Sequence, residues 1–305
     1  MTFLQSKSFQ RALKKNAPLY LLFLPTIAFY LIFKYAPMGG VLIAFKAYNF
    51  RDGIWNSPWV GWEHFELLFQ STRTVLVIWN TFKLSMLSLI ISFPFPILLA
   101  ILLNEVRKMW FRRAVQTIVY LPHFFSWVII GGMVATIFSM QSSLLNHVIT
   151  RVYGEPIPFM YQPGSWTAIF IGSGIWKEMG FSAIIYLAAL STIDPALYEA
   201  ASIDGAGKLR KIWSITLPGI SSTVVLVFIL SLGRVMEVGF DHVYNLQNNA
   251  VASVSEVIST YIYAVGIQGG QFSLTTAMGL FESVIGFILV LSANWGARKL
   301  GHGLF

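Results

Sequence analysis

Polar and aromatic side chains that could bind a hydroxylated ligand interrupt the long apolar runs of this chain. Charged groups hydrogen-bond hydroxyls and a tryptophan offers a flat apolar face, so such a set suits a site with few oriented polar contacts. The alternative is an ion pair that fixes helix packing without touching a ligand, and packing is the favoured role of the tryptophan taken alone. The candidates for a substrate path are Trp176, Lys177, Arg234, Glu237, Asp241 and Glu282.

Lys177 needs a partner, because a charge at bilayer depth costs about 2.5 to 3.5 kcal/mol on insertion scales. Glu178 is adjacent in sequence and points elsewhere on a helix, so it is expected to be a poor partner. Glu282 lies at a similar distance from the outer end of its own apolar run. We therefore expect Lys177 to pair with Glu282 or, alternatively, with Glu237.

Catalytic chemistry has no support in the sequence. There are no cysteines, and the histidines do not have metal-ligand spacing. No serine lies in a strand-turn-helix nucleophile pattern, and no Gly-x-x-x-x-Gly-Lys-Ser/Thr loop is present to hold ATP. We expect neither an enzyme nor a bound cofactor or metal. The five histidines are His64, His123, His147, His242 and His302.

A polar stretch between two apolar runs has the pattern of a helix, a break and a second helix. Asp194 is a suitable helix N-cap, and Pro195 fits the first helical position. Residues 196–203 favour a helix, and Gly205 can adopt the positive φ that ends it. A second short, basic, amphipathic helix is expected over residues 206–215.

The same stretch has features of a docking element. Ala200 and Ala201 are small enough to let another surface approach, Glu199 offers an anchoring charge, and Pro218 opens the next apolar run. Two short helices at right angles to the membrane spans would form a rigid lever. The alternative is a helix pair that lies on the lipid headgroups.

The composition indicates a membrane protein. The 305 residues are 56% hydrophobic and 11% charged, whereas soluble proteins carry about 25% charged residues. The net charge is +8, but the basic residues punctuate apolar runs and form no patch. They therefore indicate orientation in a lipid bilayer and not a nucleic-acid partner.

Six apolar runs have the length of about 20 residues that a membrane-spanning helix needs. The first begins after a basic segment but is not followed by a cleavage site, so we expect a retained helix and not a signal peptide. The expected spans are residues 17–35, 84–103, 115–139, 166–190, 220–237 and 275–295.

Lysine and arginine set the expected orientation. Thirteen lie in the N-terminal tail, after spans two and four, and at the C-terminus, against four in the alternate segments. This bias predicts that both termini and the 194–218 stretch are cytoplasmic. The outer segments 39–73 and 240–274 are long enough to need structure of their own and are candidate contacts for an extracytoplasmic partner.

The spacing Glu-Ala-Ala, three residues, Gly, nine residues, Ile-x-Leu-Pro resembles the signature loop of permease subunits in binding-protein-dependent ABC importers. In that family the loop inserts into a groove on the ATP-hydrolysing subunit. Segments 174–195, 239–244 and 273–281 are similar to carbohydrate-class permeases, in particular the LplB-like oligosaccharide group, although Asn248 and Asn249 replace an expected Asn-Pro pair. The matching loop residues are Glu199, Ala200, Ala201, Gly205, Ile215, Leu217 and Pro218.

The resemblance implies an all-α polytopic membrane protein with the type I ABC importer permease fold, six transmembrane helices and a cytoplasmic helix-turn-helix coupling loop. Its division would be a basic tail over 1–16, a first transmembrane helix and extracytoplasmic segment over 17–72, a permease core over 73–297 with coupling loop 194–218, and a tail over 298–305.

The implied function is that of a permease subunit in a bacterial cytoplasmic membrane. It would import a sugar or oligosaccharide together with a second permease chain, in this family usually a different one, an ATPase dimer and an extracytoplasmic sugar-binding protein. The alternative is a secondary transporter driven by an ion gradient, with Lys177, Glu237 and Glu282 as its relay. That alternative requires inverted repeats, which are not evident in the sequence.

Overall fold

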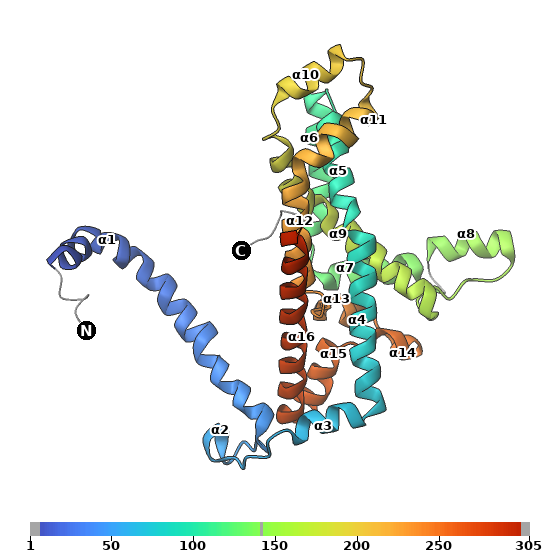
Figure 1. Ribbon diagram of the computed structural model, residues 1–305. Helices are drawn as coiled ribbons and strands as arrows, with labels where there is room; N and C mark the ends of the chain where they lie inside the picture. The colour runs from blue at the N-terminus through green and yellow to red at the C-terminus, as the bar shows by residue number, and fades with distance from the viewer. Residues whose placement is uncertain (1–6, 141–142, 300–305) are drawn as a thin grey trace.

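The computed structural model describes residues 7–140 and 143–299. The ends of the two expected tails, residues 1–6 and 300–305, lie outside the described residues. Within the described part the chain is helical, and its strand-like pairing is an isolated bridge between Lys46 and Trp59. Long helices run side by side, α10 and α11 lie at one end of the bundle, and α2 and α3 lie at the other (Figure 1).

The elements follow one another without a sheet. The first half of the chain holds α1 (Lys7–Tyr30), η1 (Leu31–Tyr35), η2 (Ala36–Phe45), α2 (Gly53–Asn56), α3 (Glu63–Gln70), α4 (Thr72–Ser92), α5 (Pro94–Glu105), α6 (Met109–Tyr120), η3 (Leu121–Phe124), α7 (Trp127–Phe138) and α8 (Leu144–Tyr153). The second half holds α9 (Pro163–Leu190), α10 (Pro195–Ile203), α11 (Lys208–Lys211), η4 (Ile212–Thr216), α12 (Leu217–Gly233), α13 (Phe240–Leu246), η5 (Asn249–Val251), α14 (Ala252–Ser255), α15 (Ile258–Tyr261), η6 (Ile262–Gln268) and α16 (Phe272–Lys299).

Five continuous helical segments of the described chain are long and apolar enough to cross a membrane, and a bent pair adds a sixth when its two halves are counted as one span. The five are Asn16–Phe45, Thr72–Glu105, Pro163–Leu190, Lys208–Gly233 and Phe272–Lys299. The pair is Met109–Phe124 and Trp127–Phe138, which meet at 103°. Six spans therefore fit the described chain, with boundaries that differ from the expected ones.

The third span is broken, where the sequence predicted one run over 115–139. Pro122 lies in the 3₁₀ turn η3 that ends the first half, and Ser126 starts the second half by accepting a hydrogen bond from the Ile129 amide at 3.4 Å. Proline and an N-cap serine both favour a new helix start. A count of apolar residues cannot detect this bend.

The second short helix expected over 206–215 is continuous with the next membrane span. The predicted lever of two separate short helices is therefore wrong. Residues Lys208–Gly233 form one continuous span. The π turn η4 precedes Pro218, which lies in the first turn of α12. A proline inside a helix leaves an earlier carbonyl without its amide donor, and the π turn directly before Pro218 is the irregular turn at which this helix accommodates it. The first helix, α10, has the expected cap: Asp194 accepts a hydrogen bond from the Ala196 amide at 2.9 Å, and Gly205 has a φ of +75°.

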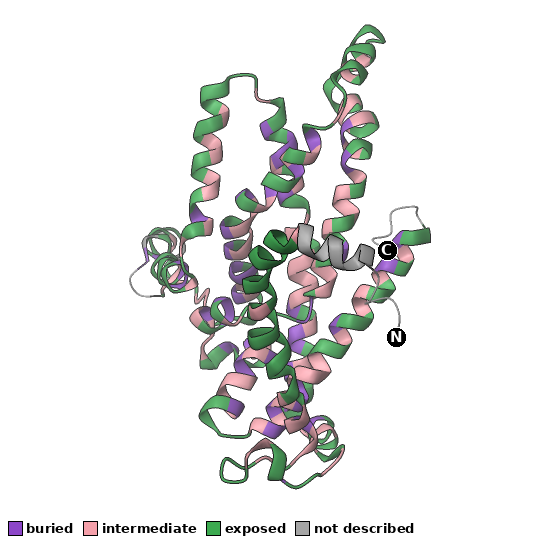
Figure 2. Ribbon diagram, turned by 90° about the vertical axis from the view of Figure 1, so that its left-hand side faces the viewer, coloured by how far each residue is buried: buried purple, intermediate pink, exposed green. Residues whose placement is uncertain are grey.

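The first span stands apart from the rest of the chain. It leans away from the bundle (Figure 1), and the apolar window of Asn16–Phe45 contains no buried residue. Its end, η2, packs on α16. Buried residues concentrate where the other spans meet, while the outer surfaces are exposed (Figure 2).

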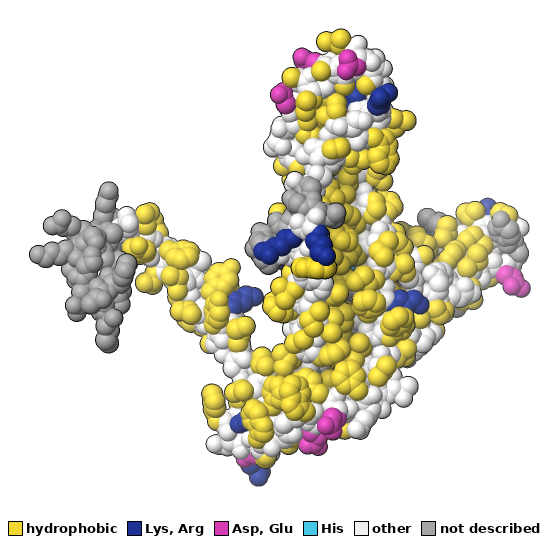
Figure 3. All heavy atoms as spheres, viewed as in Figure 1, with side chains coloured by type: hydrophobic (Ala, Val, Ile, Leu, Met, Phe, Trp, Pro, Cys, Tyr) yellow, Lys and Arg dark blue, Asp and Glu magenta, His cyan; other side chains and the backbone are white. Residues whose placement is uncertain are grey.

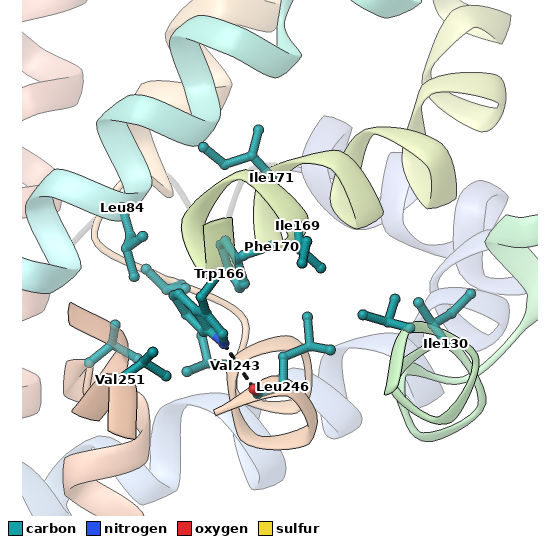
Figure 4. Packing of buried hydrophobic residues seen from close by; sticks show 12 residues of the cluster. Leu84, Ile130, Trp166, Ile169, Phe170, Ile171, Val243, Leu246 and Val251 are labelled. Atoms are coloured by element: carbon teal, nitrogen blue, oxygen red, sulfur yellow. Dashed lines mark hydrogen bonds between the residues drawn. The ribbon is translucent and has the colours of Figure 1, made fainter. Parts of the chain in front are cut away.

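The core of the bundle is built around α9. Trp166 is fully buried and donates its indole N–H to the Leu246 carbonyl at 2.9 Å, which ties α9 to α13 (Figure 4). At Gly180 an added Cβ would lie 2.0 Å from the Val119 carbonyl oxygen. The glycine therefore allows α6 and α9 to pack backbone against backbone, and α9 is held on several sides.

Candidate functional site

A central cavity of about 300 Å³ lies between α4, α9, α12 and the segment that leads to α13. Its polar lining comes from several elements, and none of the lining positions lies in the 194–218 stretch. The polar and charged lining residues are Ser85, Ser88, Ser92, Glu178, Ser231, Arg234, Glu237 and His242.

Three serines of α4 form one wall of the central cavity. Ser85, Ser88 and Ser92 are three and four residues apart, so they lie on one face of the helix. The hydroxyl oxygens of Ser85 and Ser88 are buried and have no hydrogen-bond partner among the described residues. A buried hydroxyl without a partner costs about 1 to 3 kcal/mol. These serines are therefore suited to a hydroxylated ligand or water.

His242 forms a rigid part of the opposite wall. Its ring is stacked between Trp127 and Phe170, with centroid distances of 3.6 and 3.9 Å. Its Nε2 lies 3.0 Å from the Ser173 hydroxyl. Stacking on both faces and a hydrogen bond at the edge fix the ring, so α7, α9 and α13 share one aromatic layer beside the cavity.

A second, adjoining cavity of about 170 Å³ continues from the central one. It runs along α4, α5, α9 and α12 and includes Pro96, Tyr186 and Val227. Tyr186 and Val227 are nearer to the α10 end of their helices than the central lining is. The two cavities share Leu89, Ser92, Gly174, Glu178 and Ser231. Together they follow the helices from mid-bundle toward α10.

The structure separates the six predicted path residues. Arg234 and Glu237 line the central cavity. Trp176 instead lines an apolar cavity of about 530 Å³ between α7 and α9. Asp241 is exposed and Glu282 is half-buried, and neither lines the central or the adjoining cavity.

Lys177 has partners other than those expected. Its side chain is buried, with the residue 6% exposed, and its ammonium donates to the carbonyls of His123 at 2.6 Å and Phe125 at 2.8 Å. It lies 3.6 Å from Glu178 Oε1. The expected pairing with Glu282 or Glu237 is wrong in the described structure. At the break in the third span, backbone carbonyls have no amide donor from the helix. The Lys177 ammonium donates to two of these carbonyls instead.

Glu282 lies within electrostatic range of a second acidic residue. It interacts electrostatically with Glu237, although these two residues were expected to be alternative partners of one lysine.

The predicted coupling residues gather at the α10 end of the bundle. Glu199 and Ala200 are exposed, whereas Ile215 and Leu217 are half-buried. The Tyr198 hydroxyl lies 3.0 Å from the Thr216 hydroxyl, which ties α10 to the start of the long helix Lys208–Gly233.

The same end exposes large apolar side chains. Ile203 is 87% exposed, and Leu209 and Trp213 are also exposed. Hydrophobic side chains cover much of the visible face, including this end, where acidic and basic side chains lie among them (Figure 3). An exposed apolar group ringed by charge is typical of a surface that binds another protein.

Sequence reasoning missed the serine wall, Glu178 and His242. The serine spacing within an apolar run was a readable signal, because it places three hydroxyls on one helix face. Glu178 was dismissed as a partner for Lys177, and His242 was considered only as a metal ligand. Their roles depend on the bend in the third span and on the position of α13.

Comparison with known proteins identifies the family. Residues 92–302 match the model of the binding-protein-dependent transport system inner membrane component family. The chain belongs to this family. It is 43% identical to the protein LplB of Bacillus subtilis (strain 168), over 98% of this chain and 94% of that protein.

Two further matches have a stated transport role. The polygalacturonan/rhamnogalacturonan transport system permease protein YteP of Bacillus subtilis (strain 168) is 47% identical, over 93% of this chain and 88% of that protein. A chain of a bacterial alginate ABC transporter, crystallised with an alginate pentasaccharide-bound periplasmic protein, matches with a TM-score of 0.88 and 42% identity, over 96% of this chain and 98% of that chain.

These findings confirm the all-α type I importer permease fold and the resemblance to the LplB-like group. This inner membrane component crosses the membrane several times. It is a transport subunit and not an enzyme, and ATP hydrolysis belongs to a separate ATPase. The family gives no support to a transporter driven by an ion gradient.

Proposed function

We propose that this chain is the permease subunit of an ATP-driven importer for a sugar or oligosaccharide that an extracytoplasmic binding protein delivers. The observation that carries the proposal is similarity, over nearly the whole chain, to a permease of polygalacturonan/rhamnogalacturonan transport. The two cavities along α4, α9 and α12, whose largely apolar walls carry several polar side chains, are consistent with it.

The substrate path consists of the central and adjoining cavities. Serine hydroxyls, Arg234 and Glu237 offer donors and acceptors to sugar hydroxyls. Ligand pockets for small molecules measure about 300 to 1,000 Å³, so the central cavity is at the small end of the range. A second permease chain then supplies the rest of the path. Lys177 serves helix packing, and Trp176, Asp241 and Glu282 line neither of these two cavities.

Energy enters at the α10 end. The coupling residues are Glu199, Ala200, Ala201, Gly205, Ile215, Leu217 and Pro218, and they bind a groove on one subunit of an ATPase dimer. Because α10 is bonded to the start of a helix of 26 residues, about 39 Å long, a push on α10 reaches the other end of that helix. Arg234 follows directly there and lines the central cavity.

The continuity of the helix through Pro218 suits this transmission of movement. A continuous helix transmits an axial push, whereas a hinge at the membrane entry would absorb it. Closure of the ATPase subunits would rock the spans from inward-open to outward-open, and the binding protein would release its sugar into the cavity.

The chain lies in a bacterial cytoplasmic membrane with both termini and α10 in the cytoplasm. The support is the excess of lysine and arginine in those segments. On this orientation α2 and α3 face the binding protein, and the exposed apolar side chains of α10 and α11 face the ATPase.

Purification of the tagged chain from its native host tests the proposal. We expect an ATPase subunit and a second permease chain to co-purify in stoichiometric amounts. Recovery of the chain alone from a mild detergent, with full transport activity after reconstitution, would reject the proposed assembly.

A further inference from the structure

Glu178 lies where the two cavities meet. Of the five described residues that line both cavities, Glu178 is the one that carries a charge, and the others are leucine, glycine and two serines. Its side chain is 45% exposed. Anything that passes from the central cavity to the adjoining one therefore passes this carboxylate.

Two basic side chains, His123 and Lys177, hold the carboxylate of Glu178 in place. Oε2 accepts a hydrogen bond from His123 Nδ1 at 2.9 Å, and Oε1 lies 3.6 Å from Lys177 Nζ. The His123 ring is itself stacked on Phe181 at 4.0 Å with an interplanar angle of 1°. Lys177 is anchored to the two carbonyls at the break in the third span. The bend and the carboxylate thus share one set of contacts.

The bound carboxylate keeps capacity for a ligand. An ionised carboxylate has about four lone-pair positions, of which His123 occupies one and Lys177 approaches another. Two acceptor positions remain on a side chain that is nearly half exposed and belongs to a residue lining both cavities. Two neighbouring hydroxyls of a sugar ring match a pair of carboxylate oxygens in geometry, and hydrogen bonds to a charged acceptor are the stronger kind.

We propose that Glu178 binds the vicinal hydroxyls of a sugar ring at the junction of the two cavities, and that His123 and Lys177 are positioning residues for its carboxylate. The inference rests on the proposed function and goes further by assigning the contact to one residue. Lys177 also binds the two carbonyls at the break in the third span. The position of the Glu178 carboxylate therefore depends on that bend.

The test uses the whole importer, with its ATPase, second permease and binding protein, reconstituted in proteoliposomes. Labelled oligogalacturonides, alginate oligosaccharides and arabino-oligosaccharides are offered to the wild-type complex, and the one that is imported becomes the probe. Glu178→Gln keeps the shape of the side chain but replaces one acceptor oxygen by an NH₂ donor. We expect the KM for the probe to rise about ten-fold or more, the effect of losing a hydrogen bond to a charged group, with the maximal rate within about two-fold.

Two variants of His123 separate positioning from folding. His123→Phe keeps the ring stack on Phe181 but removes the donor, so KM should rise as in Glu178→Gln. His123→Asn places an N–H donor near the position of Nδ1 and should return KM to within about three-fold of wild type. Asp241→Asn is the matched control, because it removes a carboxylate that lines neither cavity.

The outcomes distinguish the two proposals. Failure of the wild-type complex to import any of the probes would contradict the proposed function. Import by wild type with an unchanged KM in Glu178→Gln would overturn the role of Glu178 alone, and so would an equal rise in Asp241→Asn. If Glu178→Gln does not assemble, His123→Phe decides the matter, and an unchanged KM in that variant overturns the inference.

Discussion

The close approach of α6 and α9 gives a sharp prediction for Gly180→Ala. A Cβ at Gly180 would lie 2.0 Å from the Val119 carbonyl oxygen and 2.5 Å from the Val119 carbonyl carbon. Ordinary contacts of a Cβ begin near 3.4 Å. The two helices must therefore separate by more than about 1 Å, and the obstructing atoms are backbone that cannot rotate away.

The magnitude follows from the cost of overpacking. Inserting a methyl group into a packed core costs about 1 to 3 kcal/mol, and we expect the upper part of this range because backbone must move. For chains of 150–250 residues 1 kcal/mol corresponds to about 2 to 4 °C in Tm. We therefore expect Gly180→Ala to lower the Tm by about 5 to 10 °C.

The assay is thermal unfolding of the purified variants in one detergent, followed by tryptophan fluorescence. Gly172→Ala is the matched control, because it lies on the same helix and its added Cβ meets no atom within 4 Å. Its Tm should stay within about 2 °C of wild type or rise, since alanine favours a helix by up to about 1 kcal/mol. Equal Tm values for the two variants would refute the argument that α6 and α9 touch at Gly180.

Three further predictions concern the core, the coupling loop and the orientation. Trp166→Phe leaves a buried carbonyl without its donor and should destabilise the protein by about 1 to 3 kcal/mol, measured as a lower Tm. Glu199→Ala with Gly205→Pro should reduce ATP-driven uptake at least about ten-fold without loss of membrane insertion, because proline cannot adopt the φ of +75°. The chain has no cysteine, so in intact cells an impermeant maleimide should label Asp52→Cys but not Asp204→Cys.

Each of these predictions has an opposite outcome that counts against it. An unchanged Tm in Trp166→Phe would show that its hydrogen bond contributes nothing. Gly207→Ala is the control for the coupling variant, because its backbone has a negative φ and its Cβ meets open space. Normal uptake in the double variant would rule out the docking role. Labelling of Asp204→Cys from outside would reverse the proposed orientation.

The sequence predicted the architecture well where the signal was local. Long uncharged runs predicted the membrane spans, and the capping pattern predicted the start of α10 at Asp194 and its end near Gly205. These features depend on residues within one helical turn of each other. The family resemblance likewise rested on short motifs with fixed spacing.

The site could not be read in the same way, because it depends on contacts between distant segments. The break in the third span places the carbonyls of His123 and Phe125 beside Lys177. Both residues are more than fifty positions from Lys177 in the chain. The apolar content of that span gave no sign of the bend. Likewise, nothing in the spacing of Glu237 and Glu282 indicated that these two acidic residues lie within electrostatic range of each other.

Pro218 misled for a different reason. A proline at the entry to an apolar run predicts a boundary between a short helix and a membrane span. Here Pro218 directly follows a π turn, and the helix continues through it. The resulting continuous helix strengthens the coupling hypothesis, because it connects the docking end to the central cavity.

The energy source of uptake tests the central claim most directly. Proteoliposomes that contain the complete importer should accumulate labelled oligosaccharide only with ATP at the α10 side and binding protein at the other side, and an uncoupler should have no effect. Uptake that persists without ATP and collapses with the uncoupler would contradict the account.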